Sequence, residues 1–133
     1  MAKILVVDEN KDARDFITQF FGERNFEVFT AINPDDIFLT IKKDRPDIVL
    51  LDIKTKDKSR IELLKQITKK SRKTKVVVVA SMNDIEIMDE AKRWGAAAYL
   101  IKPIMLSELM DAVLKNFGRQ HRFFALKRIS RNV

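Results

Sequence analysis

The chain has 133 residues, of which 46% are hydrophobic and 34% charged, so it can form one packed domain and is too short for two ordinary ones. Cysteine is absent and His121 is the single histidine, which excludes disulfides, thiolate or histidine-rich metal sites and a conventional Ser-His-Asp triad. The formal net charge of +7 is concentrated near the C-terminus, because residues 118–133 hold five bases and no acid.

Nothing in the sequence indicates insertion into a membrane or export. No apolar run approaches the roughly 20 residues that a membrane helix needs. The N-terminus leads directly into strand-like sequence and lacks the features of a signal peptide. We therefore expect a cytoplasmic protein.

The first half of the chain alternates between apolar runs and amphipathic segments. Lys3–Val7 is a continuous apolar strand, and Asp12–Gly22 carries apolar residues at helical spacing, whose phenylalanines we place in the core. Phe26–Ala31 predicts a second strand. Asn33, followed by a proline and two acids, is typical of a helix start and predicts a helix to about Lys43.

The second half repeats this alternation. Its predicted elements are, in order, a strand at Asp47–Leu51, a helix capped by Ser59, a strand at Val76–Val79, a helix over Asp84–Trp94, a strand at Ala97–Ile101 and a helix capped by Ser107. We place Trp94 in the core. Five strands that alternate with five helices favour a parallel α/β sheet.

Gly118 marks the one candidate boundary. We predict a single domain over residues 1–117 and a basic C-terminal extension or linker over 118–133. Within that tail, apolar residues are interleaved with bases. The sequence leaves open whether this segment extends the last helix, begins a linker or docks on a partner.

Charged residues stand at the ends of three predicted strands. Asp8 and Glu9 follow the first strand, Asp52 follows the third and Lys102 follows the fifth. The carboxyl ends of parallel strands meet at one edge of the sheet, so we expect these side chains to gather there. Clustered carboxylates repel one another unless a cation joins them, and a hard ion such as Mg²⁺ suits them. The pattern predicts an acidic metal site beneath a lysine, suited to a phosphoryl group.

The sequence resembles the receiver domains of two-component response regulators from residue 3 to about residue 117. Four stretches in the expected order carry the resemblance, and they are Lys3-Ile-Leu-Val-Val-Asp-Glu-Asn10, Asp47-Ile-Val-Leu-Leu-Asp-Ile53, Glu62-Leu-Leu-Lys65 and Gly95-Ala-Ala-Ala-Tyr-Leu-Ile-Lys-Pro103. The resemblance implies a flavodoxin-like, doubly wound (βα)5 fold whose five-stranded parallel sheet has the order 2-1-3-4-5.

The resemblance also implies a role for each strand-end residue. Asp52 would accept a phosphoryl group from the phosphohistidine of a histidine kinase or a phosphotransfer protein. Asp8, Glu9 and Asp52, with the backbone carbonyl of Lys54, would hold Mg²⁺. Lys102 would contact the phosphoryl oxygens as a point charge, and the bond between it and the following proline is expected to be cis.

Several positions bear on how such a switch would work. Tyr99 stands where the family has its aromatic switch residue, although a half-buried strand aromatic explains it as well. Ala80 stands where the family has a Thr or Ser, and Ser81 can substitute only if the backbone turns there. Arg60 replaces a glycine, so we expect a reshaped loop after Asp52. That loop is also basic, with Lys54, Lys56, Lys58 and Arg60 against Asp57. Its charge would suit a phosphorylated partner or would compete with Mg²⁺, and a solvated loop is our default expectation.

Two functional hypotheses follow. The first is a phosphoryl-accepting switch whose helix 4/strand 5/helix 5 face, roughly residues 84–117, changes its partner preference. It would be no enzyme beyond self-catalysed phosphotransfer and autodephosphorylation. The second is a degenerate receiver that binds proteins without phosphorylation.

The partners implied are a kinase or phosphotransfer protein and a downstream protein or fused output domain. We do not expect DNA binding by this chain. A homodimer stays open, as do the kinase, the pathway and whether the chain is stand-alone or an amino-terminal piece of a longer protein.

Overall fold

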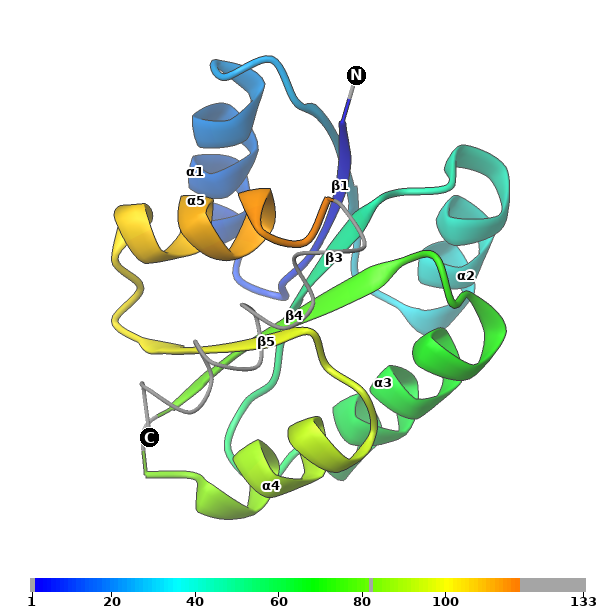
Figure 1. Cartoon of the computed structure of the whole chain (residues 1–133), viewed down its shortest axis with the longest axis vertical. Coiled ribbons are helices and arrows are strands. Elements are labelled where there is room, and N and C mark those ends of the chain that lie inside the picture. The colour runs from blue at the N-terminus through cyan, green and yellow to red at the C-terminus, as the bar shows by residue number, and fades with distance from the viewer. Residues whose placement is uncertain (1, 82, 118–133) are drawn as a thin grey trace.

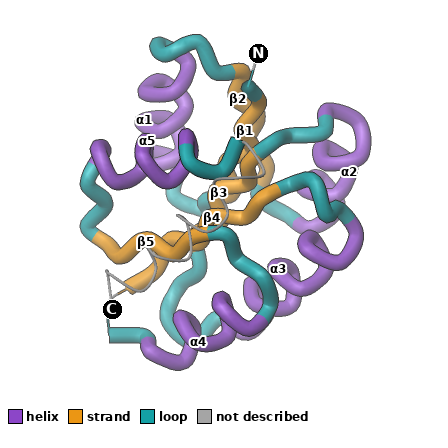
Figure 2. The backbone as a smooth tube through the Cα atoms, in the orientation of Figure 1, coloured by secondary structure: helices purple, strands orange, loops and turns teal. Residues whose placement is uncertain are grey.

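The computed structural model describes residues 2–81 and 83–117. A twisted central sheet lies between two layers of helices, with α1 and α5 on one face and α2, α3 and α4 on the other (Figures 1 and 2). The elements in chain order are β1 (Lys3–Val7), α1 (Lys11–Gly22), β2 (Glu27–Ala31), α2 (Pro34–Asp44), β3 (Ile48–Asp52), α3 (Lys58–Lys70), β4 (Lys75–Ser81), α4 (Ile85–Arg93), β5 (Ala98–Lys102) and α5 (Leu106–Leu114).

The five strands are parallel and lie in the order β2-β1-β3-β4-β5. This confirms the flavodoxin-like α/β fold and the strand order expected from the sequence. Strand β3 is buried throughout and β4 is buried except at its ends, because helices cover both faces of the sheet. The chain order reverses next to β1, between β1 and β3, and sheets of this kind place their sites in the crevice beyond such a reversal.

Two helix caps differ from the prediction. Ser59 does not cap α3, because the carboxylate of Asp57 occupies the cap position and accepts hydrogen bonds from the backbone N–H groups of Ser59 and Arg60. A carboxylate also interacts favourably with the positive end of the helix dipole, which a hydroxyl does not match. Ser107 lies inside the first turn of α5, and Met105 occupies the cap position without a side-chain hydrogen bond.

Two aromatic residues expected in the core lie at the surface. Phe16 is exposed on α1, whereas Phe21 on the same helix is fully buried. Trp94 is exposed at the end of α4, where its Nε1 donates a hydrogen bond to Glu90 and the ammonium of Lys65 lies over its ring. Within the described ranges, 2–81 and 83–117, no helix is long and apolar enough to span a membrane.

Candidate functional site

Three side chains meet at the carboxyl edge of the sheet. Asp52 is the last residue of β3, Lys102 is the last residue of β5, and Asp8 directly follows β1. Strands β1 and β3 are neighbours in register, so Asp8 and Asp52 emerge side by side. Both carboxylates are buried, with 9% and 8% exposure respectively. The strands therefore place two of the predicted acids and the predicted lysine together.

Lys102 reaches across β4 to the acid on β3. Its Nζ lies 2.5 Å from Oδ1 of Asp52, and the lysine side chain remains partly exposed. Oδ1 has no protein hydrogen bond among the described residues, so this ion pair is what offsets its charge. A flexible ammonium in contact with a buried carboxylate can move to a new oxygen placed nearby. The peptide bond that follows Lys102 is cis, as expected from the sequence.

The ionised carboxylate of Asp8 is disfavoured at its position in the fold. Burial raises the pKa of this carboxyl, and the neighbouring charge of Asp52 raises it further. The backbone N–H of Asn10, 2.9 Å from Oδ1, acts in the opposite direction, as do the charges of Lys102 and Lys54. Because the raising effects dominate, this cluster of carboxylates favours the arrival of a cation.

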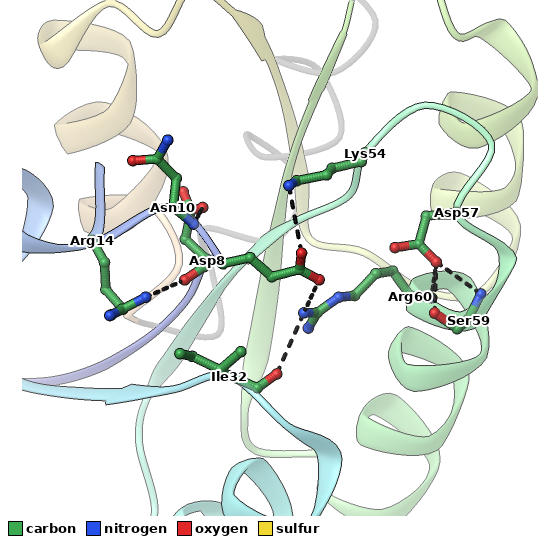
Figure 3. A network of polar contacts seen from close by, with 9 residues as sticks. Asp8, Asn10, Arg14, Ile32, Lys54, Asp57, Ser59 and Arg60 are labelled. Carbon is green, nitrogen blue, oxygen red and sulfur yellow. Dashed lines mark hydrogen bonds and ion pairs between the residues drawn. The ribbon is translucent and has the colours of Figure 1, made fainter. Parts of the chain in front are cut away.

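Glu9 is engaged by two cations of the β3–α3 region. Nη2 of Arg60 donates to Oε1 at 3.1 Å, and Nζ of Lys54 lies 3.4 Å from Oε2. The hydrogen bond from Arg60 lowers the pKa of Glu9 most, followed by the bond from Lys54. In Figure 3 the side chains of Lys54 and Arg60 both point at one carboxylate and are joined to it by dashed lines. Across the part of the chain that the structure describes, no three acidic side chains are grouped closely enough to hold a metal ion together.

Arg60 is the pocket residue that the sequence did not predict. It lies in the first turn of α3 and is only 8% exposed, so it is not one of the solvated bases expected there. Nη2 also donates to the carbonyl of Ile32 at 3.3 Å, while Nη1 is buried without a partner among the described residues. Arg60 itself does not have a positive φ; Lys56, in the preceding loop, takes up the left-handed conformation with φ of 62°.

Two carboxylates and one carbonyl of the predicted donor set fit a magnesium ion. Mg²⁺ in proteins is commonly held by one or two carboxylates together with water and phosphate oxygens. Asp8 and Asp52 supply two such carboxylates. The carbonyl of Lys54 accepts a hydrogen bond from the N–H of Asp57 at 3.0 Å, which leaves its second lone pair for a ligand. Glu9, in the arrangement seen here, is bound to cations instead.

The end of β4 provides no free hydroxyl. Ala80 is buried and its methyl side chain has no donor, and the hydroxyl of Ser81 donates to Oδ1 of Asn83 at 2.8 Å. Tyr99 is 1% exposed, and its hydroxyl lies 3.4 Å from the carbonyl of Ser81, to which it donates. Burial raises the pKa of Tyr99 to about 12. The tyrosine thus lies inside the protein in this structure.

The loops on either side of the pocket are joined. The Asp84 side chain caps α4 and also accepts a hydrogen bond from the backbone N–H of Lys56 at 3.0 Å. Lys58 at the start of α3 forms an ion pair with Glu86 of α4. The side chains of Lys54, Lys56 and Lys58 are nevertheless exposed, as expected for this loop, and of its bases only Arg60 is buried.

A comparison with protein families gives this arrangement a context. The model of the response regulator receiver domain matches residues 4–114. The chain belongs to the response regulator receiver family. Receiver domains are signalling domains of two-component systems, and the order of the strands and the strand-end acids described above agree with that membership.

Similar proteins differ in how much of their length the receiver occupies. Sporulation initiation phosphotransferase F of Bacillus subtilis is 31% identical over 113 residues, which cover 85% of this chain and 91% of that protein. Regulatory protein AtoC of Escherichia coli is 32% identical over 80% of this chain, but the match spans only 23% of AtoC. The crystal structure of NtrX from Brucella abortus has a TM-score of 0.80 at 28% identity and covers 92% of this chain and 28% of NtrX.

Proposed function

We propose that this receiver accepts a phosphoryl group on Asp52 from the phosphohistidine of a histidine kinase or a phosphotransfer protein, with Mg²⁺ as cofactor. One observation carries this proposal. The Asp52 carboxylate is buried at the end of β3 beside Asp8, and Nζ of Lys102 lies 2.5 Å from its Oδ1. The similarity to sporulation initiation phosphotransferase F supports the same reading.

Each residue has a defined part in such a transfer. A carboxylate oxygen of Asp52 forms the new P–O bond in line as the P–N bond breaks, and the imidazole of the donor keeps the electron pair and takes up a proton. Lys102 would leave the carboxylate and pair with a phosphoryl oxygen, so that its charge follows the negative charge. Asp8 and Asp52 would hold Mg²⁺, which supplies positive charge to the transferring group. The domain would have no further enzymatic activity than this transfer and its own dephosphorylation.

The response to phosphorylation should be weaker than in relatives with a hydroxyl at the end of β4. Ala80 cannot donate to a phosphoryl oxygen, and the hydroxyl of Ser81 is already bound to Asn83. Loss of one hydrogen bond to a charged group is worth about 1.5–3 kcal/mol. We propose that the face formed by α4, β5 and α5 still carries the signal to a downstream protein or a fused output domain, with a smaller shift in population.

The alternative, a degenerate receiver that binds proteins without phosphorylation, is less well supported. A module of that kind would not need two carboxylates buried side by side at a cost, with a lysine in contact with one of them. Burial of charges without a compensating role lowers stability. The geometry of Asp8, Asp52 and Lys102 therefore favours chemistry at this pocket.

The test is intact mass spectrometry after incubation with Mg²⁺ and acetyl phosphate. Wild type should gain one phosphoryl mass and Asp52→Asn should gain none, because the amide is not a nucleophile for phosphorus. Asp89→Asn is a matched control, since Asp89 is exposed on α4 and should leave labelling unchanged. Equal labelling of wild type and Asp52→Asn would refute the assignment of Asp52.

A further inference from the structure

Arg60 stands in an unusual place for a cation. It lies in the first turn of α3, where the helix dipole disfavours positive charge, and it is 8% exposed. A buried guanidinium requires acids around it, and its only ion pair among the described residues is with Glu9, 51 residues away in the sequence. The position of Arg60 is therefore coupled to that of Glu9.

We propose that Arg60 is a built-in counter-ion of the acidic pocket, which keeps Glu9 from acting as a metal ligand and thereby weakens the binding of Mg²⁺. This rests on the magnesium site of the proposed function. Two linked observations carry it. Glu9 is bound by cations on both of its oxygens, and no three acidic side chains of the described residues form a metal-binding group.

If a metal ion bound Glu9, the buried guanidinium of Arg60 would lose its ion pair. The hydrogen bond from Nη2 to Oε1 would be lost, and Nη1 already lacks a partner among the described residues. An unpaired buried charge is strongly unfavourable, so the arginine competes with Mg²⁺ for the same carboxylate. Lys54 competes less, because its side chain is 56% exposed and its Nζ lies 3.4 Å from Oε2.

The variant that tests this is Arg60→Met. Methionine removes the charge but retains an unbranched side chain that is compatible with a helix. Mg²⁺ is titrated into the full ¹⁵N-labelled chain, and the amide of Asn10 reports binding because its N–H donates to Asp8. We expect the dissociation constant of Mg²⁺ to fall about tenfold or more, which is what one hydrogen bond between charged groups is worth. Lys54→Met is the matched control, and its effect should be under about threefold.

The double variant Arg60→Met/Glu9→Gln separates the two ways in which the arginine could act. If Arg60 withholds Glu9, the gain in Mg²⁺ affinity disappears when Glu9 is neutralised. If the double variant binds Mg²⁺ as tightly as Arg60→Met does, the proposal is overturned, because the gain in affinity would then come from removing a positive charge alone. An unchanged or weaker affinity of Arg60→Met would overturn it as well. Circular dichroism and thermal unfolding verify that each variant is folded, and Arg60→Gln replaces Arg60→Met if the latter is not.

This readout is distinct from phosphorylation. Tighter Mg²⁺ binding in Arg60→Met, together with no phosphoryl gain by wild type from either acetyl phosphate or a phosphorylated kinase, would uphold the counter-ion and refute the proposed function. Labelling of Asp52 combined with unchanged Mg²⁺ affinity in Arg60→Met would support the proposed function and refute the role of Arg60.

Discussion

Replacement of Asp8 by asparagine is expected to stabilise the fold at neutral pH. The pKa of Asp8 is raised by burial and by the charge of Asp52, so the ionised carboxylate destabilises the folded state. The amide removes that charge at nearly constant shape, and its oxygen can still accept the hydrogen bond from the N–H of Asn10, which is 2.9 Å long in the parent protein. No packing contact needs to be lost.

The expected size is that of other single stabilising substitutions, including those that improve charge. Such changes commonly add about 0.5–2 kcal/mol to the free energy of unfolding. For a domain of this length, each kcal/mol raises the melting temperature by roughly 3–5 °C. Asp89→Asn, an exposed change on α4, is the control and should lie within about 0.5 kcal/mol of wild type.

The stability gained by Asp8→Asn should depend on pH. The folded pKa of Asp8 lies above the ordinary value of 3.8, so the folded state binds the proton more tightly than the unfolded state does. The destabilisation is therefore absent below about 3.8, grows as the pH rises through the raised pKa and is complete above it. Urea unfolding without Mg²⁺ should show a gain for Asp8→Asn at neutral pH that shrinks toward acid pH. A loss of stability at neutral pH, or a gain independent of pH, would refute the account of Asp8.

Two further outcomes are expected. Tyr99 is the single tyrosine, so its phenolate absorbance should titrate near pH 12 in the folded protein. The stability of the fold should fall as the pH rises above about 10, because the tyrosine of the unfolded chain ionises first. A titration midpoint near pH 10 in the folded protein would contradict the burial of the ring. Ala80→Ser should enlarge the phosphorylation-dependent amide shifts over 84–117 without changing the extent of labelling, since it adds the missing donor at the end of β4; equal shifts in both proteins contradict this.

Most of the fold could be predicted because its determinants are local or periodic. The continuous apolar runs of β1, β3 and β4 identify buried parallel strands, and the apolar spacing between them identifies helices. The predicted bounds differ from the observed ones by one or two residues, as with β3, which ends at Asp52 and not at Leu51. Strand ends depend on hydrogen bonds to neighbouring strands, which a single sequence does not display.

The caps show where local reasoning is insufficient. Ser59 and Asp57 are both acceptable capping residues, and only the path of the backbone decides between them. The positive φ of Lys56 turns the chain so that the Asp57 carboxylate faces the open N–H groups of α3. Asp84 stabilises this turn, because its carboxylate accepts a hydrogen bond from the backbone N–H of Lys56. The cap of one helix therefore depends on the cap of another that lies 27 residues further on.

Arg60 illustrates the same limit at the site itself. A lysine-rich loop is normally solvated, and nothing next to Arg60 in the sequence marks it as buried. The one available signal was the replacement of a small residue by a large cation close to a predicted acidic pocket. In the folded protein three cations lie against the acids that the sequence identified, Lys54 and Arg60 from the β3–α3 region and Lys102 from the end of β5.

Two of the ion pairs that these cations form differ in how easily they can be exchanged. Lys102 and Asp52 form a pair with a flexible, partly exposed partner, so this contact can be exchanged for a phosphoryl oxygen at little cost. Arg60 and Glu9 form a pair whose arginine is buried, so its exchange leaves a charge without a partner. Under the proposed function, phosphoryl transfer to Asp52 would proceed while Glu9 stays in place. The affinity for Mg²⁺ would then be set by Arg60, whose hydrogen bonds and ion pair among the described residues do not include Asp52.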